Sequence, residues 1–191
     1  MSSPLQIFID ACLINNFVLA YFLGICPFLG VSNKTETAFR MGAAVTFVML
    51  IASTSGYGIH LLLTRIGAPY LHLVSYIVVI ASSVQLVEMF IKKFSPTLFR
   101  ALGIYLPLIT TNCAILGLVL FQTSREYNFL QCLAFALGAG AGFTLALLIM
   151  SGIRERLELA NVSTIVQGAA ITLMVAGVLS MTFMGFAGMG R

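Results

Sequence analysis

Long apolar runs separated by short charged connectors are the feature that most constrains this chain. Six runs can be drawn, at about Leu5–Phe28, Met41–Leu63, Tyr70–Ile91, Leu98–Phe121, Phe129–Gly152 and Ser163–Ala187. Each is close to the ~20 apolar residues that a helix needs to cross ~30 Å of hydrocarbon. Only 8% of the 191 residues are charged, against roughly 25% in soluble domains. The pattern predicts an all-α integral membrane protein, with six transmembrane helices in a single membrane domain over residues 1–191.

The connector charges predict how the spans are oriented. The connectors after spans one, three and five hold seven cations, which are Lys34, Arg40, Lys92, Lys93, Arg100, Arg154 and Arg156. The other side holds three, Arg65, Arg125 and Arg191. The positive-inside rule places the seven in the cytoplasm, so both termini are expected outside it. Because the net charge of +4 is spread over connectors, it does not indicate nucleic-acid binding.

The sequence contains a weak internal repeat, with repeat one at about 1–95 and repeat two at about 96–191. Phe22–Gly30 reads FLGICPFLG and Ile109–Gly117 reads ITTNCAILG, so both contain C-x-x-L-G. Further on, Gly42–Ser53 reads GAAVTFVMLIAS and Gly140–Ser151 reads GAGFTLALLIMS. Because each half has an odd number of spans, the two halves are expected to insert as inverted repeats.

Cys26 and Cys113 occupy equivalent positions in the two repeats. Helix-disturbing residues lie near each, Gly24, Pro27 and Gly30 in one case and Pro107 and Gly117 in the other. Spans one and four are therefore expected to be broken into half-helices, which is the best sequence indication of a site near the membrane midplane. In unbroken helices the two cysteines would lie ~9 Å and ~20 Å from the cytoplasmic boundary, too far apart for one small centre.

Two thiolates cannot complete a four-ligand metal site, but a second protein could supply two more. The alternative is that Cys26 and Cys113 are small apolar packing residues, as cysteine often is. Cys12 and Cys132 have no equivalent in the other repeat. They are interpreted as packing residues.

Polar residues within the spans are candidates for lining an ion path or a cofactor. They are Asp10, Asn15, Asn16, Glu88, Thr110, Thr111 and Asn112. Ionisable groups at membrane depth indicate function by default, whereas hydrogen bonding between helices explains the amides and hydroxyls equally well. For Glu88 the alternative is an ion pair with Lys92. His60 and His72, near span ends, are interpreted as interfacial.

Two further stretches have structural interpretations. Gly138, Gly140 and Gly142 give span five a small-residue face for close helix packing. Arg154–Arg156 is interpreted as a solvated loop. No nucleotide-binding loop, HExxH motif or nucleophile elbow occurs in the sequence, so no catalytic residue is assigned and a complete reaction is not expected from this chain alone.

Four segments of the sequence resemble the RnfA/NqrE family, and the resemblance covers essentially the whole chain. The segments are Asn15–Val31, Leu102–Gly117, Gly152–Leu157 and Phe183–Gly188. The segment Cys26–Ser32, which reads CPFLGVS and follows the pair Asn15-Asn16, is closer to the RnfA branch of the family than to the NqrE branch. The resemblance implies a membrane subunit of the Rnf complex, a translocase of the bacterial inner membrane that couples electron transfer between NADH and ferredoxin to Na⁺ or H⁺ movement.

The resemblance also implies a cofactor and partners. Cys26 and Cys113 match the family's ligands to a [2Fe–2S] cluster shared with a homologous subunit of opposite orientation, RnfE. Subunits B, C, D and G would complete the complex, and would carry the flavins and the further iron–sulfur clusters. The alternatives are an NqrE-like subunit of the Na⁺-translocating NADH:quinone reductase, a small inverted-repeat secondary transporter, and a purely structural scaffold.

Overall fold

The computed structural model of the chain describes residues 3–32, 34–67, 71–94, 109, 111–159 and 168–187. Every element in these ranges is helical, which confirms the all-α prediction. The elements are α1 (Pro4–Ile9), the π-helix η1 (Asp10–Ile14), α2 (Phe17–Tyr21), α3 (Ile25–Val31), α4 (Thr35–Ile66), α5 (His72–Phe94), α8 (Cys113–Ser124), α9 (Phe129–Leu159) and α10 (Ala169–Ala187).

Three of these helices are long and apolar enough to cross a membrane, in the segments Thr35–Ile66, His72–Met89 and Phe129–Leu157. They correspond to expected spans two, three and five. Shorter apolar helices cover Pro4–Ile14, Cys113–Ser124 and Ala170–Gly185, within expected spans one, four and six. The first half of span four and Pro107 lie outside the described residues, so its predicted break remains a prediction.

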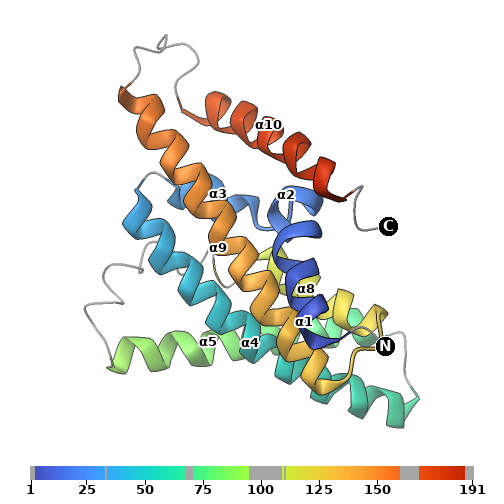
Figure 1. Ribbon diagram of the computed structural model, residues 1–191. Helices are drawn as coiled ribbons and strands as arrows, with labels where there is room; N and C mark the ends of the chain where they lie inside the picture. Colours follow the sequence, from blue (N-terminus) through green and yellow to red (C-terminus); the bar gives the residue numbers. More distant parts are fainter. Residues whose placement is uncertain are drawn as a thin grey trace.

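The long helices α4 and α9 lie side by side at the centre of the molecule (Figure 1). Their contact depends on residues without bulky side chains. A Cβ added to Gly42 would lie 2.5 Å from Oγ1 of Thr144, and one added to Gly140 would lie 2.5 Å from Cγ2 of Thr46. The two contacts are reciprocal, because each helix places a glycine against the other's threonine. Such close approach is typical of helix pairs in membranes.

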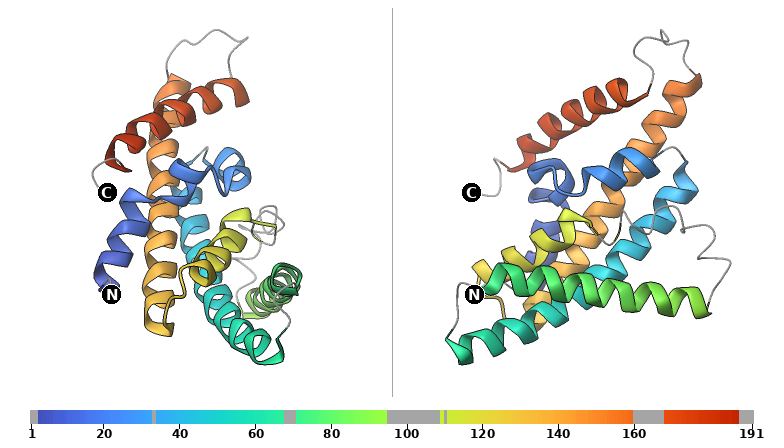
Figure 2. Two further views of the ribbon diagram at one scale, coloured as in Figure 1. Left: turned by 90° about the vertical axis from the view of Figure 1, so that its right-hand side faces the viewer. Right: turned by 180° about the vertical axis from the view of Figure 1, so that it is seen from behind.

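The remaining helices pack around this pair. α1 and η1 pack on α9, whereas α8 packs on α4. α5 packs on α4 and α8, and α10 packs on α2 and η1. α5 and α10 lie on opposite sides of the central pair (Figures 1 and 2).

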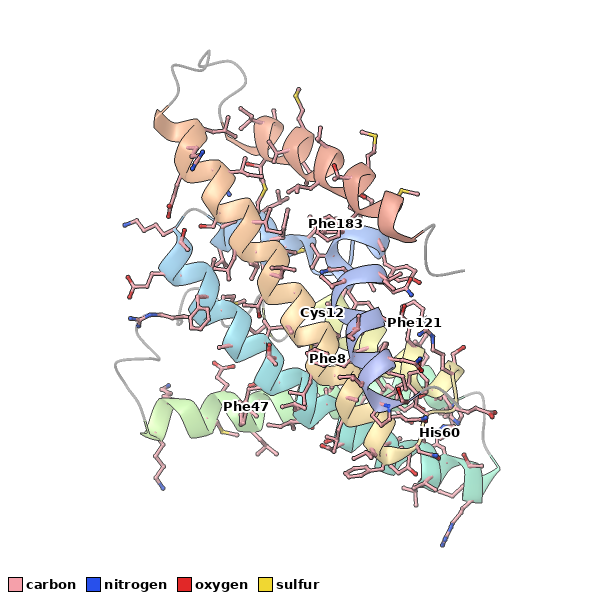
Figure 3. The ribbon with its side chains drawn as sticks, in the orientation of Figure 1. Phe8, Cys12, Phe47, His60, Phe121 and Phe183 are labelled. Carbon is pink, nitrogen blue, oxygen red and sulfur yellow. The ribbon has the colours of Figure 1, made fainter. Side chains whose placement is uncertain are left out.

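The predicted glycine face of α9 receives the first segment of the chain. A Cβ on Gly138 would lie 2.6 Å from the carbonyl oxygen of Phe8, and one on Gly142 would lie 2.7 Å from that of Cys12. Phe8 and Cys12 are labelled in Figure 3, where they lie beside α9. The interpretation of these glycines as packing residues is confirmed, but they do not share one face, because Gly140 packs on Thr46 of α4.

Expected span one is broken twice. The first break is at Asn15, after which Asn16 caps α2 by accepting a hydrogen bond from the N–H of Val18. The second break comprises Phe22 and Gly24, whose φ angles of 55° and 80° are both left-handed. Pro27 lies in the first turn of α3, where proline is tolerated. The prediction of a break near Cys26 is therefore confirmed, whereas the break at Asn15 was missed, because neither proline nor glycine adjoins it in the sequence.

Candidate cysteine site

Cys26 and Cys113 each stand at the start of a helix that follows irregular backbone. Cys26 is the second residue of α3, after Gly24, which is left-handed and makes no side-chain cap. Cys113 is the first residue of α8, and Asn112 caps that helix by accepting from the N–H of Ala114 at 3.0 Å. The two thiols thus have matching positions at helix N-termini.

The structure places Cys113 beside the second break of span one. The backbone N–H of Gly24 donates a hydrogen bond to Sγ of Cys113 at 2.9 Å. Gly24 precedes Cys26 by two residues, so both cysteines lie at the same break. The unbroken-helix geometry, with the cysteines at different depths, does not apply to this chain.

The four cysteines differ in exposure. Cys26 and Cys113 are exposed, Cys12 is half-buried and Cys132 is buried, and none of the four is in a disulfide. Cys132 is 2% exposed, and its thiol donates to the carbonyl of Tyr127 at 3.5 Å. The packing interpretation of Cys12 and Cys132 agrees with these positions. Cys26 and Cys113, which match each other in the repeat, are therefore the two cysteines exposed at the surface of the chain.

Two buried asparagines cap the helices near this site, with one difference. Nδ2 of Asn16 donates to the carbonyl of Gly142 at 2.8 Å and to that of Cys12 at 3.2 Å. Asn112 is 5% exposed, and its Nδ2 is buried without a hydrogen-bond partner in the described part of the chain. A buried donor without an acceptor costs about 1–3 kcal/mol. Asn16 therefore has a clear structural role, whereas Nδ2 of Asn112 is unpaired among the described residues.

Asp10 and Asn15 belong to a separate polar cluster. Asn15 donates to Asp10 at 2.8 Å, and Asp10 forms an ion pair with Arg125 at 3.6 Å. The guanidinium also donates to the hydroxyl of Tyr127 and lies about 6 Å from the rings of Phe121, Tyr127 and Phe135. Burial lowers the pKa of Arg125, but the hydrogen bond to Tyr127 and the charge of Asp10 raise it by more, so it stays above its ordinary value. The cluster joins the first segment to the α8–α9 connector.

The other polar candidates lie apart or are not described. Thr111 is exposed and stands two residues before Cys113. Glu88 is half-buried on α5, near the end that carries Lys92 and Lys93. Thr110 lies outside the described residues. Their assignment to an ion path remains a prediction.

The interpretation of Arg154–Arg156 as a solvated loop was wrong. These residues continue α9, which extends to Leu159. Arg154 donates to the carbonyl of Leu29 at 3.0 Å and to the hydroxyl of Ser32 at 2.8 Å. Glu155 accepts from the N–H and the hydroxyl of Thr35 at 2.9 and 2.8 Å. The charges suggested a loop, but Arg154 binds the end of α3 and Glu155 binds the start of α4.

The two histidines meet, which spacing in the sequence did not indicate. The rings of His60 and His72 are 5.6 Å apart between centroids, and the hydroxyl of Tyr76 lies 3.5 Å from Nδ1 of His60. His60, labelled in Figure 3, lines a cavity of about 220 Å³ together with Gln122 and Glu126. Among the described residues, no three His, Cys, Asp or Glu side chains are grouped as they would be around a metal ion.

Together, the three long apolar helices, the small-residue packing and the broken first span define a multi-pass α-helical membrane protein. The family model described as "Rnf-Nqr subunit, membrane protein" matches residues 4–190. The chain belongs to the Rnf-Nqr family, which confirms the resemblance noted from its motifs.

Several relatives are similar over nearly their full length. The chain is 53% identical over 190 residues to the A subunit of the "Ion-translocating oxidoreductase complex" of Syntrophotalea carbinolica, covering 99% of this chain and 98% of that one. It is 52% identical over 184 residues to the A subunit of the "Na(+)-translocating ferredoxin:NAD(+) oxidoreductase complex" of Acetobacterium woodii, covering 96% of each. For the A subunit of the ion-translocating oxidoreductase complex of Vibrio cholerae the identity is 47%, with 99% and 98% covered.

Proposed function

We propose that this chain is a membrane subunit of an ion-translocating ferredoxin:NAD⁺ oxidoreductase and supplies two thiolate ligands, Cys26 and Cys113, to a [2Fe–2S] cluster. The relatives named as A subunits of such complexes, at about 50% identity over the full chain, support the assignment to the complex. The chain is then part of a translocase and not a complete enzyme, in the bacterial inner membrane. Subunits B, C, D and G are the expected further partners.

The observation that carries the cluster proposal is the hydrogen bond from Gly24 to Cys113. It brings the second cysteine to the break that precedes the first, and both thiols are exposed. Since no group of three potential ligands occurs in the described ranges, a four-ligand site needs two ligands from elsewhere. A homologous subunit with its own cysteine pair, RnfE in opposite orientation, meets that need.

The donor set fits an iron–sulfur cluster. Thiolates are the usual ligands of such clusters, and backbone N–H groups directed at the sulfur are a common means of tuning them. The N–H of Gly24 already has this arrangement. A [2Fe–2S] cluster, when bound, supplies a one-electron relay within the membrane, whereas this chain's residues position the two sulfurs.

The proposal includes the six-span inverted repeat, with both termini outside the cytoplasm. Its support is the reciprocal packing of Gly42 on Thr144 and Gly140 on Thr46. Each of these residues is 98 positions from its repeat equivalent. A two-fold relation between the halves would produce such paired contacts.

The proposal extends to coupling with Na⁺ or H⁺, for which the physical reason is charge. An electron that arrives at the cysteines adds negative charge in a medium of low dielectric, and a nearby cation would offset that cost. Asn112 is next to Cys113 and Thr111 is two residues before it. Nδ2 of Asn112 has no hydrogen-bond partner among the described residues. Thr111 and Asn112 are the first candidates for contact with an ion. Asp10 is a weaker candidate because Arg125 already neutralises it.

The test is to purify the complex that contains this chain and to compare its cluster signals by electron paramagnetic resonance. We expect Cys26→Ser and Cys113→Ser each to remove one [2Fe–2S] signal and to stop NADH–ferredoxin electron transfer. Cys12→Ser and Cys132→Ser are the matched controls and should keep both. A full signal in the first two variants contradicts the ligand assignment. Solute flux through this chain alone, in vesicles, would favour the secondary-transporter alternative.

A further inference from the structure

The helix that carries Cys26 is too short to hold its own position. α3 has seven residues, and its N-cap, Gly24, provides no side-chain hydrogen bond. An isolated helix of this length is not stable in water, and the preceding backbone is left-handed at both Phe22 and Gly24. Phe28 and Val31 of α3 are buried in the core, but Cys26 is exposed, so its exact place also depends on what holds the two ends of α3.

One end of α3 is held at the cysteine site and the other by Arg154. At the first end, the N–H of Gly24 donates to Cys113. At the second, one guanidinium nitrogen of Arg154 donates to the carbonyl of Leu29 and to the hydroxyl of Ser32, which is fully buried. A cation at the C-terminal end of a helix also interacts favourably with its dipole. Arg154 thus satisfies free acceptors at the end of α3.

Neighbouring residues of α9 extend this attachment to α4. Ser151, Arg154 and Glu155 share a face of α9, because residues three and four apart are neighbours on a helix. The hydroxyl of Ser151 lies 3.2 Å from that of Thr35, and Glu155 accepts twice from Thr35. One face of α9 therefore binds the chain on both sides of the α3–α4 connector.

We propose that Arg154 is a positioning residue for Cys26, which fixes α3 to α9 so that the Cys26 thiol keeps a defined place beside Cys113. The role of the positioned thiol as a ligand rests on the proposed function. The attachment itself is a property of this chain, so it is open to measurement without iron.

The first test measures the distance between spin labels on Cys26 and Cys113 in the full chain, reconstituted in lipid nanodiscs, in a Cys12→Ala/Cys132→Ser background. Both labelled side chains are exposed. We expect Arg154→Gln to broaden the distance distribution about twofold, because local opening releases α3. Arg154→Lys should broaden it less. Arg156→Gln is the matched control, an exposed arginine two residues away on the same helix, and should leave the width unchanged.

Ser32→Ala is the milder variant, which removes one of the two acceptors and keeps Arg154. It should broaden the distribution in the same direction as Arg154→Gln but by less. If Arg154→Gln does not yield folded protein, the width measured for Ser32→Ala tests the positioning role instead. A width equal to that of the parent in the folded variants overturns the positioning role.

The second test uses the assembled complex and a readout that a merely structural residue does not change. We expect Arg154→Gln to broaden the resonance lines of the cluster and to shift its midpoint potential, and Arg156→Gln to change neither. Absence of any cluster in the wild-type complex would refute the proposed function. The distances between the spin labels would still test whether Arg154 fixes α3. Unchanged lines and potential beside a broadened distance distribution would show that Arg154 holds α3 without positioning a ligand, and would overturn the proposal.

Discussion

The N–H of Gly24 donates a 2.9 Å hydrogen bond to Sγ of Cys113, across a separation of 89 residues. Through this bond, the break in the first span lies directly against the helix that Cys113 begins. The geometry depends on the left-handed φ of 80° at Gly24, which turns the backbone from α2 into α3. A change at Gly24 should therefore affect both cysteines at once.

Gly24→Ala should destabilise the chain and disturb the cysteine site. A left-handed conformation costs an L-residue about 1–2 kcal/mol, and the new Cβ would lie 2.7 Å from Cε2 of Phe143. We expect a lower unfolding temperature in detergent and a broader distance distribution between labels on the two cysteines. Gly58→Ala is the control, because nothing lies within 4 Å of its added Cβ. Equal unfolding temperatures for the two variants would contradict the prediction.

Gly42→Ala and Gly140→Ala should each destabilise the α4–α9 pair by about 1–3 kcal/mol, the usual cost of overpacking. The added methyl group of Gly42→Ala would overlap the side chain of Thr144. Adding Thr144→Ala should recover part of the loss, and unfolding of the four members of this double-mutant cycle measures the coupling. Gly152→Ala, with open space around it, should have little effect. Additive losses in the cycle would show that the two residues do not meet.

Asn16→Ser should cost more stability than Asn112→Ser. Serine keeps an oxygen that caps the helix in both cases. At Asn16 the change removes two hydrogen bonds to carbonyls, whereas at Asn112 it removes an N–H that has no acceptor in the described residues. We expect a loss of about 1–2 kcal/mol for Asn16→Ser and a smaller one for Asn112→Ser. Thermal unfolding of the isolated chain compares them, and a larger loss at Asn112 would refute this account.

Arg125→Ala should destabilise the chain by more than Asp10→Asn. The ion pair is 3.6 Å long and about one-third exposed on each side, so its contribution is about 0–1 kcal/mol. Arg125→Ala also removes the bond to Tyr127 and the contacts with three rings, for a further loss of about 1 kcal/mol. Unfolding at low and high salt separates the two parts, because salt screens the ion pair.

The same Asp10 variant tests the ion-path assignment. If Asp10 serves only to hold Arg125, Asp10→Asn leaves ion-coupled electron transfer at the wild-type rate in vesicles that contain the complex. Arg125→Lys is a useful companion, because it keeps the charge and loses the planar donor geometry. A loss of ion transport in Asp10→Asn with normal stability would restore Asp10 to the ion path.

Much of the fold and part of the site could be predicted from the sequence. Long apolar segments leave helices as the available structure in lipid, so expected spans two, three and five agree with α4, α5 and α9 to within about seven residues. Cys26 and Cys113 were singled out because they match in the repeat, and the structure brings Cys113 to the break before Cys26. The packing role of the glycines in span five followed from composition alone.

Other features depended on contacts between distant segments. The break at Asn15 was missed because it depends on the side chain of Asn16. That side chain caps α2 through the N–H of Val18 and also donates to the carbonyl of Gly142, 126 residues away. His60 and His72 are separated by a helix end, so helical spacing could not bring them together. The hydrogen bonds of Arg154 and Glu155 could not be predicted, because charged residues near the end of a span are expected to face solvent.

The sequence by itself determined that this protein is a helical membrane protein with two matched cysteines, one of them in a broken first span, because hydropathy and backbone chemistry are local properties. The tertiary structure alone decided that Gly24 meets Cys113 and that Arg154 holds the end of α3. Those contacts arise where α8 and α9 pack on earlier segments, and packing depends on the shape of both surfaces. Local sequence specifies each surface, but only the folded chain selects which surfaces meet.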